Sequence, residues 1–129
     1  QSTLPGMPIK GVLFQIARGD MTMPNPASST LIRNAWMRED TMMYRHDIAR
    51  QAIPELPANP HTFLVNVFTP AALPIALAAQ TQIAGFFSTD GTTIPDVNPL
   101  IRRLLGFNLF ETPAILPEDL GFTQFGSTP

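Results

Sequence analysis

Two side chains in this sequence are placed so that they could act together as an acid and a base, Asp20 and His61. Residues 11–17 are an apolar, β-forming run, and Asp20 follows this run after a break at Gly19. His61 follows a second predicted strand at residues 41–46. Because functional groups in open α/β sheets gather at the carboxyl ends of the strands, we expect both side chains at one sheet edge. A carboxylate that orients an imidazole makes the imidazole a general base, and the pair predicts this chemistry.

The other histidine, His46, is the alternative base. It stands at the carboxyl end of the second predicted strand and is closer than His61 to Asp20 along the chain. Its place beside Asp47 favours a structural role. Structural interpretations are open for the other two residues as well. Asp20 would then cap the turn or the following helix, and His61 would order a proline-rich loop.

The elements predicted around these residues form a βαβ unit. Asn25 and Pro26 are typical of a helix start, as the N-cap and the first helical residue. An apolar face continues from there to about Met37. The strand at 11–17, this helix and the strand at 41–46 therefore predict an α/β fold with two parallel strands.

The remainder of the chain is predicted as a loop, two helices and a tail. Residues 47–60 contain three prolines and are expected to form a long ordered loop that leads to the candidate histidine. Residues 71–87 predict an apolar helix that is buried against a sheet. Residues 98–106 predict a short amphipathic helix that Asn98 caps and Gly106 ends. The tail after this helix has no sustained apolar period.

Composition narrows the functions that this chain can have. Only 14% of its 129 residues are charged, against about 25% in typical domains, so we expect extensive contact with other protein or an unusually apolar face. The net charge of −2 and the lack of a basic run argue against nucleic-acid binding. There is no cysteine, and the two histidines do not have a metal-ligand spacing, so no metal or cofactor is expected. No stretch of the sequence has the length and apolarity of a transmembrane segment.

Two motifs in order resemble the C-terminal part of an α/β-hydrolase, and the resemblance is closest to bacterial esterases and lipases. The first motif is Gly19-Asp20-Met21-Thr22-Met23-Pro24, and the second is His61 with the apolar helix at 71–87 behind it. The resemblance covers about residues 9–90. It implies carboxylic-ester hydrolysis by a Ser-His-Asp triad in which Asp20 is the acid and His61 the base. The chain order of such a triad is serine, then acid, then histidine.

The nucleophile of that triad is expected outside this chain, because no Gly-x-Ser-x-Gly motif occurs in the sequence. The resemblance therefore implies a processed chain or fragment that pairs with an N-terminal hydrolase chain or segment carrying the serine, as in a heterodimer. Residues 1–97 would belong to the hydrolase domain, and residues 98–129 would pack on the rest of the hydrolase. The substrate would be an ester or a lipid, and the location would be extracellular or in the cell envelope.

A function from another class fits the same residues. The chain would then be a non-catalytic α/β interaction module that binds a partner through its apolar faces. A small α/β binding domain unrelated to hydrolases is the third possibility, and it predicts a stable monomer whose apolar faces are all covered.

Overall fold

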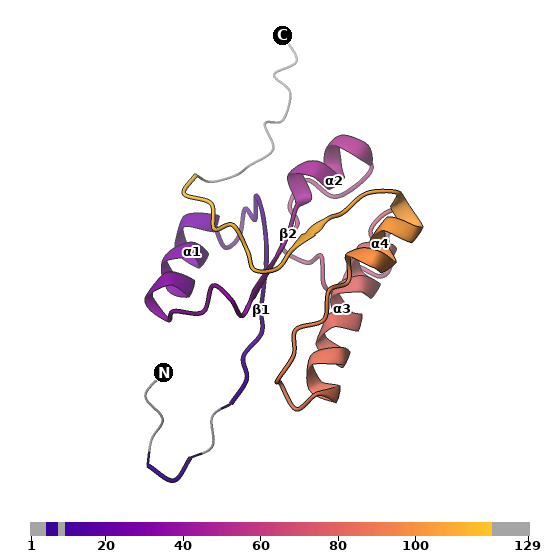
Figure 1. The fold of residues 1–129 in the computed structure, drawn as a ribbon. Helices are drawn as coiled ribbons and strands as arrows, with labels where there is room; N and C mark the ends of the chain where they lie inside the picture. The colour runs from indigo at the N-terminus through magenta and orange to yellow at the C-terminus, as the bar shows by residue number, and fades with distance from the viewer. Residues whose placement is uncertain (1–4, 8–9, 120–129) are drawn as a thin grey trace.

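A mixed three-stranded sheet lies at the centre of the fold (Figure 1). The structure, a computed structural model, describes residues 5–7 and 10–119. Within these residues the elements follow in the order β1 (Phe14–Ala17), α1 (Asn25–Asn34), β2 (Thr41–Tyr44), α2 (His46–Ala52), α3 (Leu73–Ser88), α4 (Asn98–Leu105) and β3 (Phe110–Glu111). The strand order is β1-β2-β3, with β1 parallel and β3 antiparallel to β2. The predicted mixed α/β class is confirmed.

The βαβ unit is present in the predicted order. Strand β1 pairs with β2 in a parallel register that runs from Phe14 opposite Thr41 to Ala17 opposite Tyr44. The crossover between them contains α1, and it joins two short strands of four residues each. Strand β1 is shorter than its predicted apolar run, because it starts at Phe14 rather than at residue 11.

Helices cover both faces of the sheet (Figure 1). Helix α1 lies on one side, and α3 and α4 lie on the other. Met42 and Tyr44 belong to the apolar core cluster formed with α3 and α4. Because side chains alternate along a strand, the equally buried Thr41 and Met43 face the side of α1. All four residues of β2 are therefore buried, whereas three of the four residues of β1 are only half-buried.

Helix α3 is the predicted apolar helix, and hydrogen bonds from a strand side chain tie it to the sheet. Gln15 in β1 donates through Nε2 to the Ala79 carbonyl at 3.0 Å and to Gln82 Oε1 at 2.9 Å. Gln82 is fully buried and donates in turn to the Pro95 carbonyl at 2.8 Å. None of the described helices has the length and apolarity needed to cross a membrane.

The short helix α4 ends as its sequence predicts. Gly106 follows it in the left-handed conformation with φ of +89°, which favours glycine, and its N–H bonds the Arg102 carbonyl. The predicted capping role of Asn98 is wrong. Its Oδ1 accepts from the N–H groups of Leu109 and Phe110, and its Nδ2 donates to the Phe110 carbonyl. Asn98 therefore holds β3 against the start of α4.

Two elements were not predicted. Residues 47–60 were expected to be a loop, but α2 begins at His46, directly after β2, and ends at Ala52. Its seven residues are too few for a recognisable apolar period. The tail contributes β3, whose two residues pair with Met43 and Tyr44. Such a strand depends on a partner far away in the chain, so no local pattern marks it.

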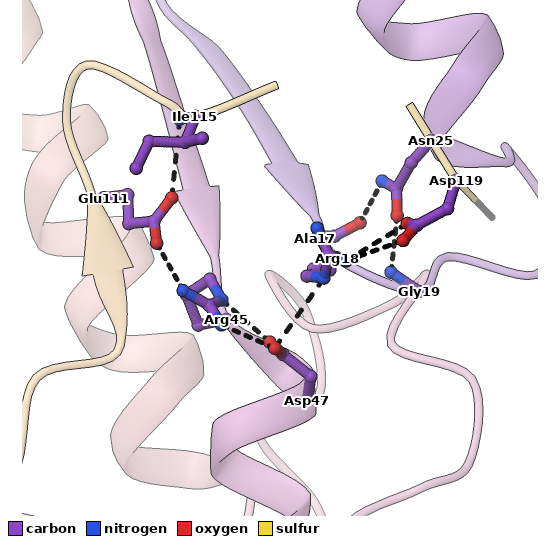
Figure 2. Close-up of polar contacts among 9 residues, drawn as sticks. All are labelled: Ala17, Arg18, Gly19, Asn25, Arg45, Asp47, Glu111, Ile115 and Asp119. Atoms are coloured by element: carbon purple, nitrogen blue, oxygen red, sulfur yellow. Dashed lines mark hydrogen bonds and ion pairs between the residues drawn. The ribbon is translucent and has the colours of Figure 1, made fainter. Parts of the chain in front are cut away.

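A network of ion pairs links the ends of the strands (Figure 2). Arg45, just after β2, donates to both carboxylate oxygens of Asp47 and to Glu111 in β3. Arg18, just after β1, lies 3.7 Å from Asp47 and donates to Asp119 at 3.1 Å. Burial, the largest single effect, would raise the pKa of Asp47, but the hydrogen bonds and the charge of Arg45, with smaller contributions from the Ile48 N–H and Arg18, together lower this pKa below its usual range. The Asp47 carboxylate is therefore charged and paired at neutral pH.

Replacing Arg45 by methionine tests whether this network stabilises the fold. Arg45→Met leaves two largely buried carboxylates without their main partner, so we expect the free energy of unfolding to fall by about 1–3 kcal/mol. Urea denaturation measures this loss. The matched control is Arg103→Met on the exposed side of α4, which should change stability by less than about 0.5 kcal/mol. Equal losses in the two variants would contradict a stabilising role for the network.

Candidate active site

The acid of the predicted pair lies in a tight turn directly after β1. Gly19 adopts a positive φ of +80°, a conformation that favours glycine, and the chain turns there. Asp20 is 9% exposed, and its Oδ1 accepts from the backbone N–H groups of Thr22 at 2.8 Å and Met23 at 2.9 Å. These two bonds fix the carboxylate and leave Oδ2 for another partner.

A buried asparagine closes this turn from behind. The Oδ1 atom of Asn25 accepts from the Gly19 N–H at 2.6 Å, and its Nδ2 donates to the Ala17 carbonyl at 2.7 Å (Figure 2). Asn25 is fully buried and is the first residue of α1, after Pro24 at the N-cap. The sequence predicted Asn25 itself as the N-cap, and this is wrong. Its side chain points back to the end of β1 instead.

The predicted base reaches the predicted acid. His61 lies in the loop between α2 and α3, and its Nδ1 is 2.9 Å from Asp20 Oδ2. A carboxylate can only accept, so Nδ1 carries the proton and donates it to Asp20. Among the described residues, no group hydrogen-bonds the other ring nitrogen, Nε2. The pair is therefore an imidazole whose tautomer is set by an acid and whose Nε2 lone pair is available.

The His61 ring borders a hollow at the edge of the sheet. The side chain is 46% exposed. The hollow has a volume of about 220 Å³ and is lined by Gln15, Ile16, Ala17, Asp20, Met23, Ser28, His61 and Phe63. Gln15 points toward α3, so the next residue, Ile16, faces the side of α1. A hollow that touches both residues lies against the edge of β1 that no strand of the described residues pairs, because β2 occupies the other edge.

The alternative base, His46, is part of the core. Its side chain is 2% exposed, and its Nδ1 is 3.1 Å from the Tyr44 hydroxyl. Burial lowers the pKa of His46 below its usual value of 6.5, and the positive charge of Arg50 acts in the same direction. Burial also raises the pKa of Tyr44 far above its usual range, so its hydroxyl stays neutral. His46 contacts no candidate acid and is buried beneath the loop that carries His61.

Two asparagines near the pair were missed as functional candidates. Asn25 orders the acid turn, and Asn59 lies two residues before the candidate histidine with its side chain against that turn. The only local signal for Asn59 is its position before Pro60, which marks a turn without showing what the side chain contacts.

Comparisons with known proteins leave the family of this chain open. It matches no protein-family model, no curated protein and no solved structure at a significant level.

The acid turn predicts a large stability cost for one substitution. Asn25→Ala leaves a buried N–H and a buried carbonyl without partners, so we expect a loss of about 2–4 kcal/mol in the free energy of unfolding. Asn34→Ala, at the exposed end of the same helix, is the matched control and should stay within about 0.5 kcal/mol of wild type. Urea denaturation of both variants makes the comparison. A loss of less than about 1 kcal/mol for Asn25→Ala would refute this role.

The buried imidazole of His46 predicts a dependence of stability on pH. The lowered pKa means that the unfolded chain binds a proton at this ring at a higher pH than the folded chain does. Above about pH 6.5 the neutral ring does not reduce the free energy of unfolding. As the pH falls below this value, the unfolded chain takes up the proton first, so the free energy of unfolding decreases.

Denaturation curves from about pH 8 to about pH 5 measure this loss. His46→Gln removes the titrating group and keeps an acceptor for the Tyr44 hydroxyl, so its stability should fall less steeply in this window. A slope equal to that of wild type would show that another group is responsible.

Proposed function

We propose that this chain supplies the acid and the base of a serine ester hydrolase with the α/β-hydrolase fold, and that a partner polypeptide supplies the nucleophile. The observation that carries the proposal is the hydrogen bond of 2.9 Å from His61 Nδ1 to Asp20 Oδ2, in a pair that leaves Nε2 without a described partner. Asp20 follows the first strand of a parallel βαβ unit, and His61 comes after the second, in the order of the hydrolase triad.

In the proposed mechanism, the two nitrogens of the imidazole have separate roles. Nε2 of His61 accepts the proton of a serine hydroxyl as its oxygen bonds to the ester carbonyl carbon. Asp20, bonded to Nδ1, stabilises the resulting imidazolium. The proton on Nε2 then passes to the departing alcohol as the ester C–O bond breaks. A water molecule then attacks the acyl-enzyme as Nε2 takes its proton. This proton passes to the serine oxygen as the acyl C–O bond breaks, which releases the carboxylic acid and restores the serine hydroxyl.

The position of the hollow supports a nucleophile that comes from outside. It lies at the unpaired edge of β1, next to the His61 ring, where a further strand could pair. Gln15 also borders it, and its Oε1 is buried without a hydrogen-bond partner in the described part of the chain. Ile16, Met23 and Phe63 give this hollow apolar walls, which suit the acyl part of an ester or a lipid.

Apolar surface supports a partner of substantial size. Large apolar side chains are exposed on several elements, with Phe87 at 71% and Leu77 at 46% on α3. A second hollow of about 470 Å³ lies between β1 and α3, and its lining includes Leu13, Ile83 and Phe87. An N-terminal hydrolase segment would cover these surfaces. The extracellular or envelope location and the division at residues 97 and 98 belong to the same proposal.

The interaction-module interpretation is the second candidate, and the same exposed apolar side chains favour it. It differs from the hydrolase in one measurable respect. A hydrolase assembly reacts with a serine-directed fluorophosphonate and reacts more slowly after Asp20→Asn, whereas an interaction module does neither.

Two substitutions test the proposal in the assembly of this chain with its partner, identified by native mass spectrometry. Asp20→Asn and His61→Ala should each lower kcat for a soluble carboxylic ester by about 10³–10⁴-fold, because either change removes the oriented base. His46→Gln is the matched control, and its kcat should be close to wild type. Near-normal turnover in either site variant would refute the assignment.

Mapping the fluorophosphonate adduct by mass spectrometry locates the nucleophile. A label on a serine of the partner supports the proposal. A label on Ser28, which lines the hollow beside His61, would place the nucleophile in this chain and contradict the need for a partner serine.

A further inference from the structure

One side chain joins the turn of the acid to the loop of the histidine. The Oδ1 atom of Asn59 accepts from the backbone N–H of Met21, next to Asp20, at 3.1 Å. The same atom accepts from the backbone N–H of His61 at 3.1 Å. Its Nδ2 donates to the Thr22 hydroxyl at 3.0 Å. Two N–H donors face one end of the amide, so the oxygen must lie at that end.

The acid and the histidine differ in how firmly other contacts fix them. The turn of Asp20 is ordered by its own bonds to Thr22 and Met23 and by the buried Asn25 behind it. The His61 ring is half exposed, and its only described side-chain bond is the one to Asp20. A single part-buried bond does not by itself fix a ring that is half exposed, because water and side-chain entropy compete with it. The ring therefore depends on how its backbone is placed.

We propose that Asn59 is a positioning residue that holds the backbone of His61 at the acid turn, so that Nδ1 stays bonded to Asp20. The inference rests on the proposed function in taking this pair as the acid and base of the hydrolase. Asn59 hydrogen-bonds the backbone on both sides, and its hydrogen bonds go neither to the ring nor to the carboxylate. It acts on the histidine through the peptide alone.

The tautomer of the His61 ring reports this role in the chain itself, without any need for activity. The bond to Asp20 holds the proton on Nδ1, whereas a released neutral ring exchanges its proton between both nitrogens. Ring ¹⁵N shifts measured by NMR, at a pH where each variant's ring is neutral, distinguish the two cases. A histidine-containing peptide supplies the reference for a released ring, whereas Asp20→Asn should reverse the tautomer, because its amide oxygen accepts from Thr22 and Met23 and its Nδ2 then donates to Nδ1.

Asn59→Ala should shift the tautomer population from that of wild type to that of the peptide reference. The Met23 amide should keep its bond to Asp20 and exchange with solvent at the wild-type rate, because the acid turn does not depend on Asn59. Asn59→Asp keeps an acceptor for both N–H groups, and the Thr22 hydroxyl can donate to its second oxygen, so it should restore the Nδ1–H tautomer. Asn66→Ala is the matched control, since Asn66 caps Thr69 in the same loop and should leave the tautomer unchanged.

The outcomes separate this inference from the proposed function. A wild-type tautomer in Asn59→Ala, with a shifted tautomer in Asp20→Asn, would overturn the positioning role alone. Loss of Met23 protection in Asn59→Ala would overturn it as well, because the effect would then be collapse of the turn. An unchanged tautomer in Asp20→Asn would overturn both ideas.

In the assembled enzyme, Asn59→Ala should lower kcat by about 10²-fold with KM nearly unchanged, since a misplaced base affects the chemical step. A change confined to KM would contradict the role.

Discussion

The parallel pairing of β1 with β2 is the constraint on which the other features depend. Parallel strands require a crossover, which here contains α1, and their carboxyl ends then meet at one edge of the sheet. Asp20 follows one of these ends directly. The chain after the other passes through α2 and a loop before His61 returns to the same edge. Arg45 and Asp47 join the two ends electrostatically, with Arg18 on the side of β1. The acid and the histidine meet because the sheet brings their loops together.

Amide side chains convert this arrangement into fixed geometry. Asn25 bonds the backbone at the end of β1, and Asn59 bonds the two loops. Asn98 does the same for β3 and α4. The side-chain amide of an asparagine carries both a donor and an acceptor, so it can hydrogen-bond backbone groups that are not paired within the sheet. A chain with short strands leaves many such groups, and these side chains replace the missing ladder bonds.

The sequence predicted what depends on local pattern. Apolar period and turn residues located β1, α1, β2, α3 and α4, and Gly106 marked the end of α4. Strand order predicted an acid and a histidine at one sheet edge, and the choice of His61 over His46 came from the resemblance to α/β-hydrolases. What the sequence did not reveal depends on contacts between distant residues. Asn25 and Asn98 both precede a proline, which is also the pattern of a helix start, so their bonds to distant backbone were hidden. The two residues of β3 have no local signal, and the proline after Asn59 marks a turn without showing what the side chain contacts.

The incomplete burial of β1 and the availability of His61 Nε2 have the same physical origin. Strand β2 is covered by helices on both faces and by strands on both edges, and all four of its residues are buried. Strand β1 has no neighbour on its outer edge in the described chain, so its side chains stay partly exposed. The hollow beside His61 lies at that same edge, and the unpartnered Gln15 oxygen borders it. Polypeptide paired along β1 would cover the strand and place its own side chains beside the imidazole. Completing the sheet and completing the candidate active site would therefore require one binding event.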